Sequence, residues 1–109
     1  MLRLPLIKGS TIHLIDLDNI LFITSDRNKI EVQTFNASYR PLMYLKDYLQ
    51  YLRPNFEQID KSTLVQITKA AAYDPVRRTL EVEHEGIRKT SYVSRSRSKK
   101  IEQLLPRKE

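Results

Sequence analysis

Residues 19–34 read NILFITSDRNKIEVQT and fall into three parts with different patterns. Its first part, ILFI, is a compact apolar run, which is typical of a strand buried on both faces. The polar residues SDRN are typical of a turn. The segment KIEVQT then alternates strictly, so that Ile30 and Val32 point inward and their neighbours outward. Two strands joined by a polar turn predict a β-hairpin, and with it a mostly β architecture.

Most of the remaining chain also predicts short strands, because it is rich in β-branched and apolar residues or alternates them with polar ones. Gly86 is expected to supply a positive φ at the bend between the last two strands. The predicted strands cover residues 11–14, 56–60, 62–67, 68–73, 79–83 and 88–93.

Residues 41–52 are the main exception and predict an internal helix. Pro41 suits a first helical position, and Pro54 stops the segment. Apolar side chains recur there at three- and four-residue spacing and form one stripe, made of Leu42, Leu45, Tyr48, Leu49 and Leu52. A short C-terminal helix is expected over residues 94–105, with Ile101, Leu104 and Leu105 on one side. The predicted fold class is therefore mostly β (α+β), with one internal and one C-terminal helix.

Length and composition set the broad class. A chain of 109 residues with 40% hydrophobic residues is expected to form one domain, residues 1–109. The chain has no cysteine, which excludes disulfides, thiolate zinc sites and cysteine nucleophiles. No stretch approaches the roughly 20 apolar residues of a membrane span. We expect a cytoplasmic protein.

Enzymatic chemistry finds little support in these residues. His13 and His84 have no further ligand at metal-binding spacing and are expected at the surface, and no serine has a neighbouring base. The two glycines lie far apart, which removes the usual phosphate-binding loops. We therefore predict a non-enzymatic protein without a cofactor or a bound metal.

The net charge of the chain is concentrated at its C-terminal end. Residues 87–109 carry the whole net charge of +6, because basic and acidic side chains balance in the rest of the chain. Residues 94–100, SRSRSKK, alternate hydroxyl and cationic side chains, and both kinds bond phosphate oxygens. An uneven basic charge of this kind indicates a polyanionic partner.

Four segments in order resemble the LytTR family of DNA-binding domains, which are found mostly at the C-terminus of bacterial response regulators. The resemblance covers about residues 7–105 and implies an elongated fold of packed antiparallel sheets that reads double-stranded DNA through loops and strand ends. The matching segments are 20–34, the helix with Leu45-Lys46-Asp47-Tyr48-Leu49, the strand pair at 56–65, and Tyr92-Val93-Ser94-Arg95 before a basic helix.

The resemblance also implies where DNA is contacted. The contacts come from the turn after the second strand, from the central strand pair, and from the Ser-Arg segment near the C-terminus. In this chain they correspond to Asn28, Lys29, Lys61, Ser62, Ser94, Arg95 and Arg97, with Lys99 and Lys100 as further phosphate contacts. Asn can bond adenine bidentately and Arg can read guanine, whereas Lys and Ser hold phosphates.

The chain departs from the family at two positions of the central strand. Family members usually carry an Arg and a His there, and this sequence has Gln58 and Asp60. Because Asp60 would repel phosphate, we expect it to turn away from DNA or to pair with a cation. The basic C-terminal segment should then contribute more of the affinity.

Several alternatives stay open. Family sites are paired imperfect repeats, which implies two copies of the chain, a homodimer on DNA, at each site. The chain is either a stand-alone regulator, controlled by a partner protein, or a fragment of a longer response regulator. A second hypothesis is a protein-interaction module whose basic end docks on an acidic partner or membrane surface, with Tyr39, Tyr44 and Tyr51 as anchors.

Overall fold

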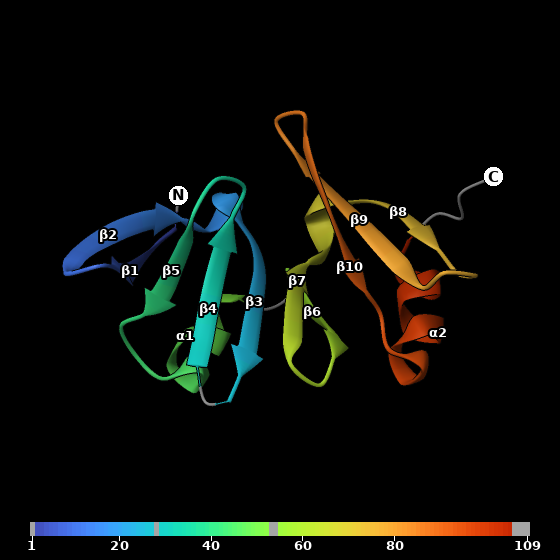
Figure 1. The fold of residues 1–109 in the computed structure, drawn as a ribbon, viewed down its shortest axis with the longest axis horizontal. Helices are drawn as coiled ribbons and strands as arrows, with labels where there is room; N and C mark the ends of the chain where they lie inside the picture. The colour runs from blue at the N-terminus through green and yellow to red at the C-terminus, as the bar shows by residue number, and fades with distance from the viewer. Residues whose placement is uncertain (1, 28, 53–54, 106–109) are drawn as a thin grey trace.

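The structure is a computed structural model that describes residues 2–27, 29–52 and 55–105 (Figure 1). It measures 44 × 30 × 22 Å along its principal axes, so the expected elongated shape is confirmed. The strands are β1 (Arg3–Lys8), β2 (Thr11–Asp16), β3 (Ile20–Asp26), β4 (Lys29–Thr34), β5 (Ser38–Pro41), β6 (Phe56–Asp60), β7 (Thr63–Gln66), β8 (Ala70–Asp74), β9 (Thr79–His84) and β10 (Ile87–Tyr92). The α-helices are α1 (Leu45–Leu52) and α2 (Arg95–Leu104), and short 3-10 helices at Leu17–Asn19 and Ile67–Lys69 precede β3 and β8.

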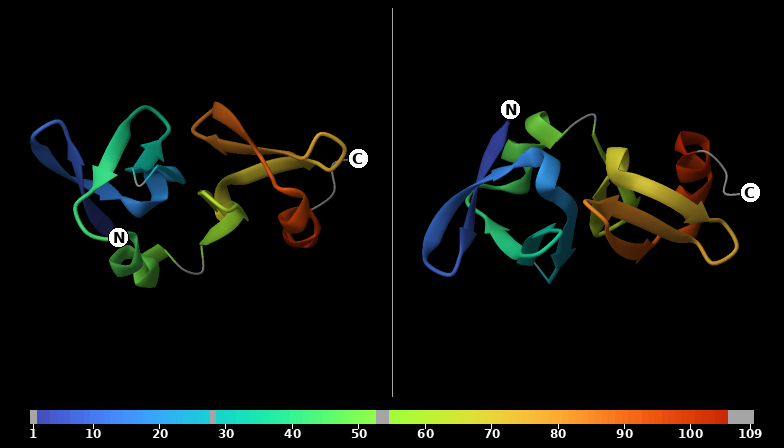
Figure 2. Two further views of the ribbon diagram at one scale, coloured as in Figure 1. Left: turned by 60° about the horizontal axis from the view of Figure 1, so that its bottom comes forward. Right: turned by 90° about the horizontal axis from the view of Figure 1, so that it is seen from above.

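The strands form two antiparallel sheets. The larger sheet has seven strands in the order β2-β1-β5-β4-β3-β7-β6, and the smaller has three in the order β10-β9-β8. Figure 2 shows β1 to β5 with α1 in one half of the molecule and β8 to β10 with α2 in the other, while β6 and β7 lie between them in Figure 1. The predicted mostly β class, with an internal and a C-terminal helix, is confirmed.

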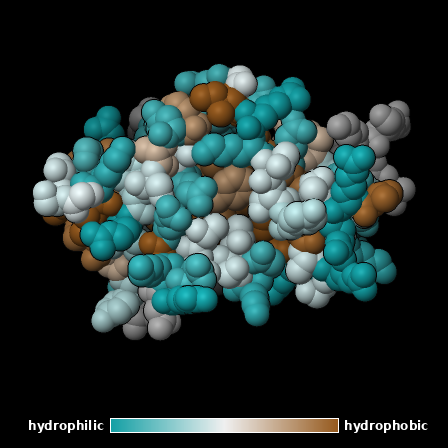
Figure 3. Space-filling model, in the orientation of Figure 1, coloured by the Kyte–Doolittle hydropathy of each residue, from teal (hydrophilic) through white to brown (hydrophobic). Residues whose placement is uncertain are grey.

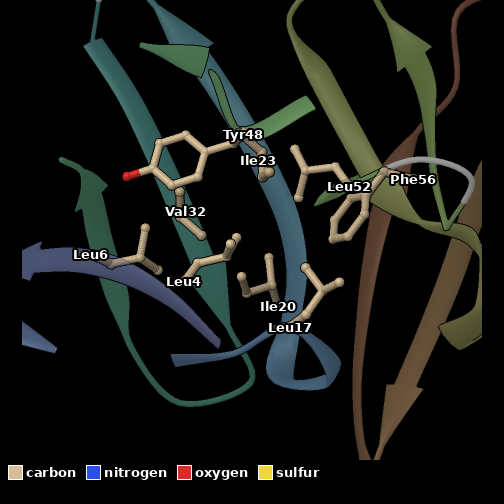
Figure 4. Packing of buried hydrophobic residues seen from close by; sticks show 9 residues of the cluster. All are labelled: Leu4, Leu6, Leu17, Ile20, Ile23, Val32, Tyr48, Leu52 and Phe56. Atoms are coloured by element: carbon tan, nitrogen blue, oxygen red, sulfur yellow. The ribbon is translucent and has the colours of Figure 1, made fainter. Parts of the chain in front are cut away.

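Strand β3 separates two hydrophobic clusters, as its unbroken apolar run predicts. Ile20 and Ile23 belong to the cluster in Figure 4, which α1 closes with Tyr48 and Leu52. Leu21 and Phe22 belong to the second cluster, beneath the smaller sheet. The pairing of β3 with β4 shifts register between Ile20 and Phe22, and this bulge lets two consecutive residues serve the same cluster.

Helix α1 is shorter than expected. It begins at Leu45, whereas Pro41 ends β5 and Leu42 is 44% exposed. The prediction that Pro41 starts the helix and that Leu42 joins its buried stripe is therefore wrong. The Tyr48 hydroxyl accepts bonds from the Leu42 and Met43 N–H groups at 2.7 and 3.1 Å and donates to the Pro5 carbonyl at 2.9 Å. These bonds give the backbone after β5 its partners without a further helical turn.

Strands β1 and β5 were not predicted by the sequence pattern. Pro5 interrupts the first and the second is only four residues long. β1 lies between β2 and β5, and its Leu4 and Leu6 are buried in the first cluster.

The C-terminal half follows the expected order with one correction. β9 and β10 form the predicted hairpin, and Gly86 has a φ of +83° at its bend. α2 buries Ile101, but Leu104 is 46% exposed. His84 is not a surface residue, because it shares a face of β9 with Leu80 and Val82 and is only 8% exposed. Among the described residues, neither helix has the length and apolar character needed to cross a bilayer.

Candidate nucleic-acid interface

Three polar segments that are distant in sequence lie along one edge of the molecule. They are the β3–β4 turn, the β6–β7 turn and the start of α2, and all three are at the lower edge in Figure 1. Backbone hydrogen bonds link them through the middle segment. The Ser25 N–H donates to the Ser62 carbonyl and the Ser94 N–H to the Ile59 carbonyl, both at 2.8 Å. The β6–β7 turn thus fixes the position of the other two segments.

The β6–β7 turn is shaped by Asp60. One oxygen of its carboxylate accepts bonds from the Ser62 N–H at 2.7 Å and from the Ser62 hydroxyl at 3.1 Å. Asp60 therefore turns into its own turn, and it forms no ion pair within the described residues. This arrangement leaves Lys61 exposed at the tip, while Ser62 is half-buried with its hydroxyl already engaged.

The start of α2 leaves its first backbone N–H groups without an acceptor in the helix. Ser94 is the N-cap in extended conformation, yet its side chain makes no capping bond and instead contacts the Ser96 hydroxyl at 3.3 Å. The first helical N–H groups, of Arg95 and Ser96, have no acceptor within the helix. The first turn carries no acidic residue, and Arg95 is exposed beside it. Free N–H groups, the helix dipole and a cation together favour a phosphate at this position.

Two of the cations on α2 are held against the protein. Arg97 Nη2 donates to the Gln58 side-chain oxygen at 3.1 Å, and Lys100 Nζ lies 3.1 Å from a Glu57 carboxylate oxygen. Lys99 is exposed and forms no ion pair with any described residue. The contacts of Arg97 and Lys100, together with a bond between Ser98 and the Tyr73 hydroxyl, attach α2 to the two sheets. The helix is therefore fixed relative to the β6–β7 turn.

The β3–β4 turn contributes the third group of side chains. Lys29 is exposed at the first position of β4, and Asn28 lies outside the described residues. Arg27 was not identified from the sequence. It is exposed in the same turn with a φ of 47°. The sequence could have indicated Arg27, because it is a cation inside the polar hairpin turn in which the resemblance already implies DNA contacts.

The edge is mostly basic as a whole. The exposed cations on it that form no ion pair with a described residue are Arg27, Lys29, Lys61, Arg95 and Lys99. Against them stand Asp26 and Asp60, the second of which is occupied by its own turn. A row of separate cations on turns and on a helix start suits a polyanion that extends across several sites.

The comparisons with known proteins agree with this geometry. A family model described as the LytTr DNA-binding domain matches residues 10–106. A solved LytTr DNA-binding domain, from a Bacillus cereus protein named as a methyl-accepting/DNA response regulator, superposes with a TM-score of 0.70 at 18% identity. The match covers 95% of this chain and 96% of that one. The search of curated proteins gives no match. The chain therefore belongs to the LytTR family of DNA-binding domains, a non-enzymatic family that binds DNA in transcriptional regulation.

Proposed function

We propose that this chain is a sequence-specific, double-stranded DNA-binding transcriptional regulator that reads paired repeats in bacterial promoters. The observation that carries this proposal is the single edge on which the β3–β4 turn, the β6–β7 turn and the start of α2 meet. A protein that reads DNA with loops needs those loops fixed relative to one another, and hydrogen bonds from Ser25 and Ser94 to the β6–β7 turn supply that rigidity.

Phosphate contacts and base contacts are assigned to different residues. The free N–H groups at the start of α2, together with Lys61 and Lys99, hold phosphates and set the register on the duplex. Arg95 and Asn28 read base edges, because a guanidinium fits guanine and a side-chain amide fits adenine. Arg97 acts mainly as support, since its guanidinium is bonded to Gln58.

The whole chain, residues 1–109, acts as one DNA-binding unit in the cytoplasm, and two copies occupy the two repeats of a site. A partner protein that controls the activity fits a regulator of this kind. The support for these points is the resemblance and the extent of the family match, residues 10–106.

Selection from a randomised duplex pool at about 150 mM salt, followed by sequencing, tests the proposal. We expect an enriched pair of short repeats about one helical turn apart. Arg95→Ala should then cost about 1–3 kcal/mol on the selected duplex and relax discrimination at one base position. Val76→Ala, on the exposed β8–β9 turn, is the control and should bind like the wild type.

The other outcome favours an interaction module. If the retained DNA shows no sequence preference and is released by modest salt, the basic edge acts only as a polycation. A stoichiometric acidic protein recovered with the wild type, and lost when the basic side chains of α2 are replaced, would then identify the partner.

A further inference from the structure

Strand β2 leaves an apolar surface uncovered at one end of the molecule. It is the outermost strand of the seven-stranded sheet, and no described strand pairs with its far side. Ile12 and Leu14 are 58 and 64% exposed on it, and they stand opposite Ile7 and Pro5 of β1 on the same face. Figure 3 shows hydrophobic residues reaching the surface at this end. Charges and prolines commonly protect such edges from pairing with another strand, and the segment TIHLI of β2 contains neither.

The free backbone groups of β2 can be assigned from its pairing with β1. Pro5 has no N–H, so its pair with Leu14 belongs to the pairs that exchange no hydrogen bonds. Bonded and non-bonded pairs alternate along an antiparallel ladder, so Ile7 and Ile12 are also a non-bonded pair. The N–H and C=O groups of Ile12 and Leu14 therefore point away from β1, toward the open edge.

We propose that β2 pairs with β2 of a second copy of this chain, antiparallel and centred on His13. In this register Ile12 lies opposite Leu14 of the second copy, and each pair exchanges two backbone hydrogen bonds. His13 lies opposite His13 of the second copy as a non-bonded pair. The apolar side chains of Ile12 and Leu14 from both copies then pack side by side on one face of the joined sheet, next to Ile7 and Pro5.

A second copy fits this edge because the strand is complementary to itself. About His13, apolar Ile12 matches apolar Leu14, and β-branched Thr11 matches β-branched Ile15. Shifting the centre by one residue to Leu14 would instead place Ile12 opposite Asp16. The matching of apolar with apolar side chains thus selects the register centred on His13.

The pairing leaves the candidate nucleic-acid interface uncovered, because β2 belongs to none of its three segments. One dimer would then carry two candidate nucleic-acid interfaces. The inference does not rest on the proposed function, since self-association is measured without DNA.

Site-specific cross-linking tests the register directly, because the chain has no cysteine of its own. In His13→Cys the two thiols face each other at a Cα separation of about 4.5 Å, within the range of a disulfide. In Leu14→Cys the two thiols are offset by two residues, or about 7 Å along the strands, which is too far for a bridge. Under mild oxidation we expect at least about tenfold faster dimer formation for His13→Cys than for Leu14→Cys.

Sedimentation velocity of the wild type gives the second readout. We expect a dimer to form at protein concentrations up to about 100 µM. Leu14→Lys should weaken the dimer by about tenfold or more, because it removes both Ile12–Leu14 cross-strand pairs and brings two cations close together. Val76→Lys is the matched control, since it adds the same charge to the 90% exposed Val76 in the β8–β9 turn. That turn and β2 lie at opposite ends of the molecule in Figure 1. Circular dichroism of each variant verifies folding.

The proposal fails if the wild type stays monomeric throughout that concentration range. It also fails if Leu14→Lys and Val76→Lys dimerise like the wild type, or if the two cysteine variants cross-link at equal rates, since the β2 register would then not govern association.

Discussion

Arg97 Nη2 donates a hydrogen bond to Gln58 Oε1 over 3.1 Å, and this contact joins helix α2 to strand β6. It connects two of the three segments of the candidate interface. Gln58 stands where the resemblance leads one to expect an arginine, so this chain uses the position to hold a cation from α2.

Gln58→Ala should weaken DNA binding by about three- to tenfold while the salt dependence stays the same. The substitution removes a neutral support and no cation, so the number of released counterions does not change. Fluorescence anisotropy over a salt series measures both quantities. Gln103→Ala, at an exposed position of α2, is the control and should bind like the wild type. Unchanged affinity in Gln58→Ala would show that this contact does not position α2 for DNA binding.

Asp60→Asn should strengthen DNA binding by about three- to fivefold at low salt. Asn keeps an oxygen that can accept the bonds from Ser62, so the turn is retained while a negative charge near phosphate is removed. Asp74→Asn is the matched control, because Asp74 accepts bonds from Val76 and Arg77 in a similar turn between β8 and β9. If both variants gain affinity equally, net charge alone accounts for the effect.

Lys99 and Lys100 should differ in their contribution to the salt dependence. Lys99→Ala is expected to reduce the slope of log K against log salt by about 0.9, the value for one phosphate contact. Lys100→Ala should change it less, because Lys100 already faces Glu57 at 3.1 Å. Binding titrations from low to moderate salt measure the two slopes. An equal reduction of the slope in Lys99→Ala and Lys100→Ala would mean that the contact between Lys100 and Glu57 breaks when DNA binds.

Local patterns predicted the elements that depend on local chemistry. The hairpin of β3 and β4 follows from an apolar run, a polar turn and an alternating segment. β1 and β5 pair with strands that are adjacent in sequence as well as with each other, but β1 contains Pro5 and β5 is only four residues long, so alternation alone does not identify them. The prediction that Pro41 starts a helix was wrong because proline suits the end of a short strand as well as a first helical turn.

The sequence indicates candidate residues for the site, but it does not indicate the contacts that hold them. A cation beside a turn is visible in the sequence, whereas the bond between Arg97 and Gln58 joins residues 39 positions apart. For His84 the signal was present. Leu80, Val82 and His84 alternate on one face, and that face is buried.

Gln66→Leu should lower the free energy of unfolding by about 2–3 kcal/mol. The Gln66 side chain is 2% exposed, and its Nε2 donates to the carbonyls of Leu17 and Ile20 at 3.1 and 2.6 Å. Leucine would leave those carbonyls without this donor. Thr68→Val removes only the bond to Gln66 Oε1 and should cost about 1 kcal/mol or less. Urea unfolding measures both, and equal losses would contradict the role assigned to the two carbonyl contacts.

His84→Phe should keep the fold and raise its stability by up to about 1 kcal/mol. The His84 ring packs against Phe35 with ring centroids 5.1 Å apart, and its Nε2 is buried without a hydrogen-bond partner in the described residues. A phenyl ring preserves the packing against Phe35 and removes the unpaired polar atom. His84→Ala is the comparison, because it removes the ring as well and should destabilise the fold. If urea unfolding shows that His84→Phe loses as much stability as His84→Ala, the Nε2 atom has a favourable partner in solution, such as water or the Glu85 carboxylate 3.9 Å away.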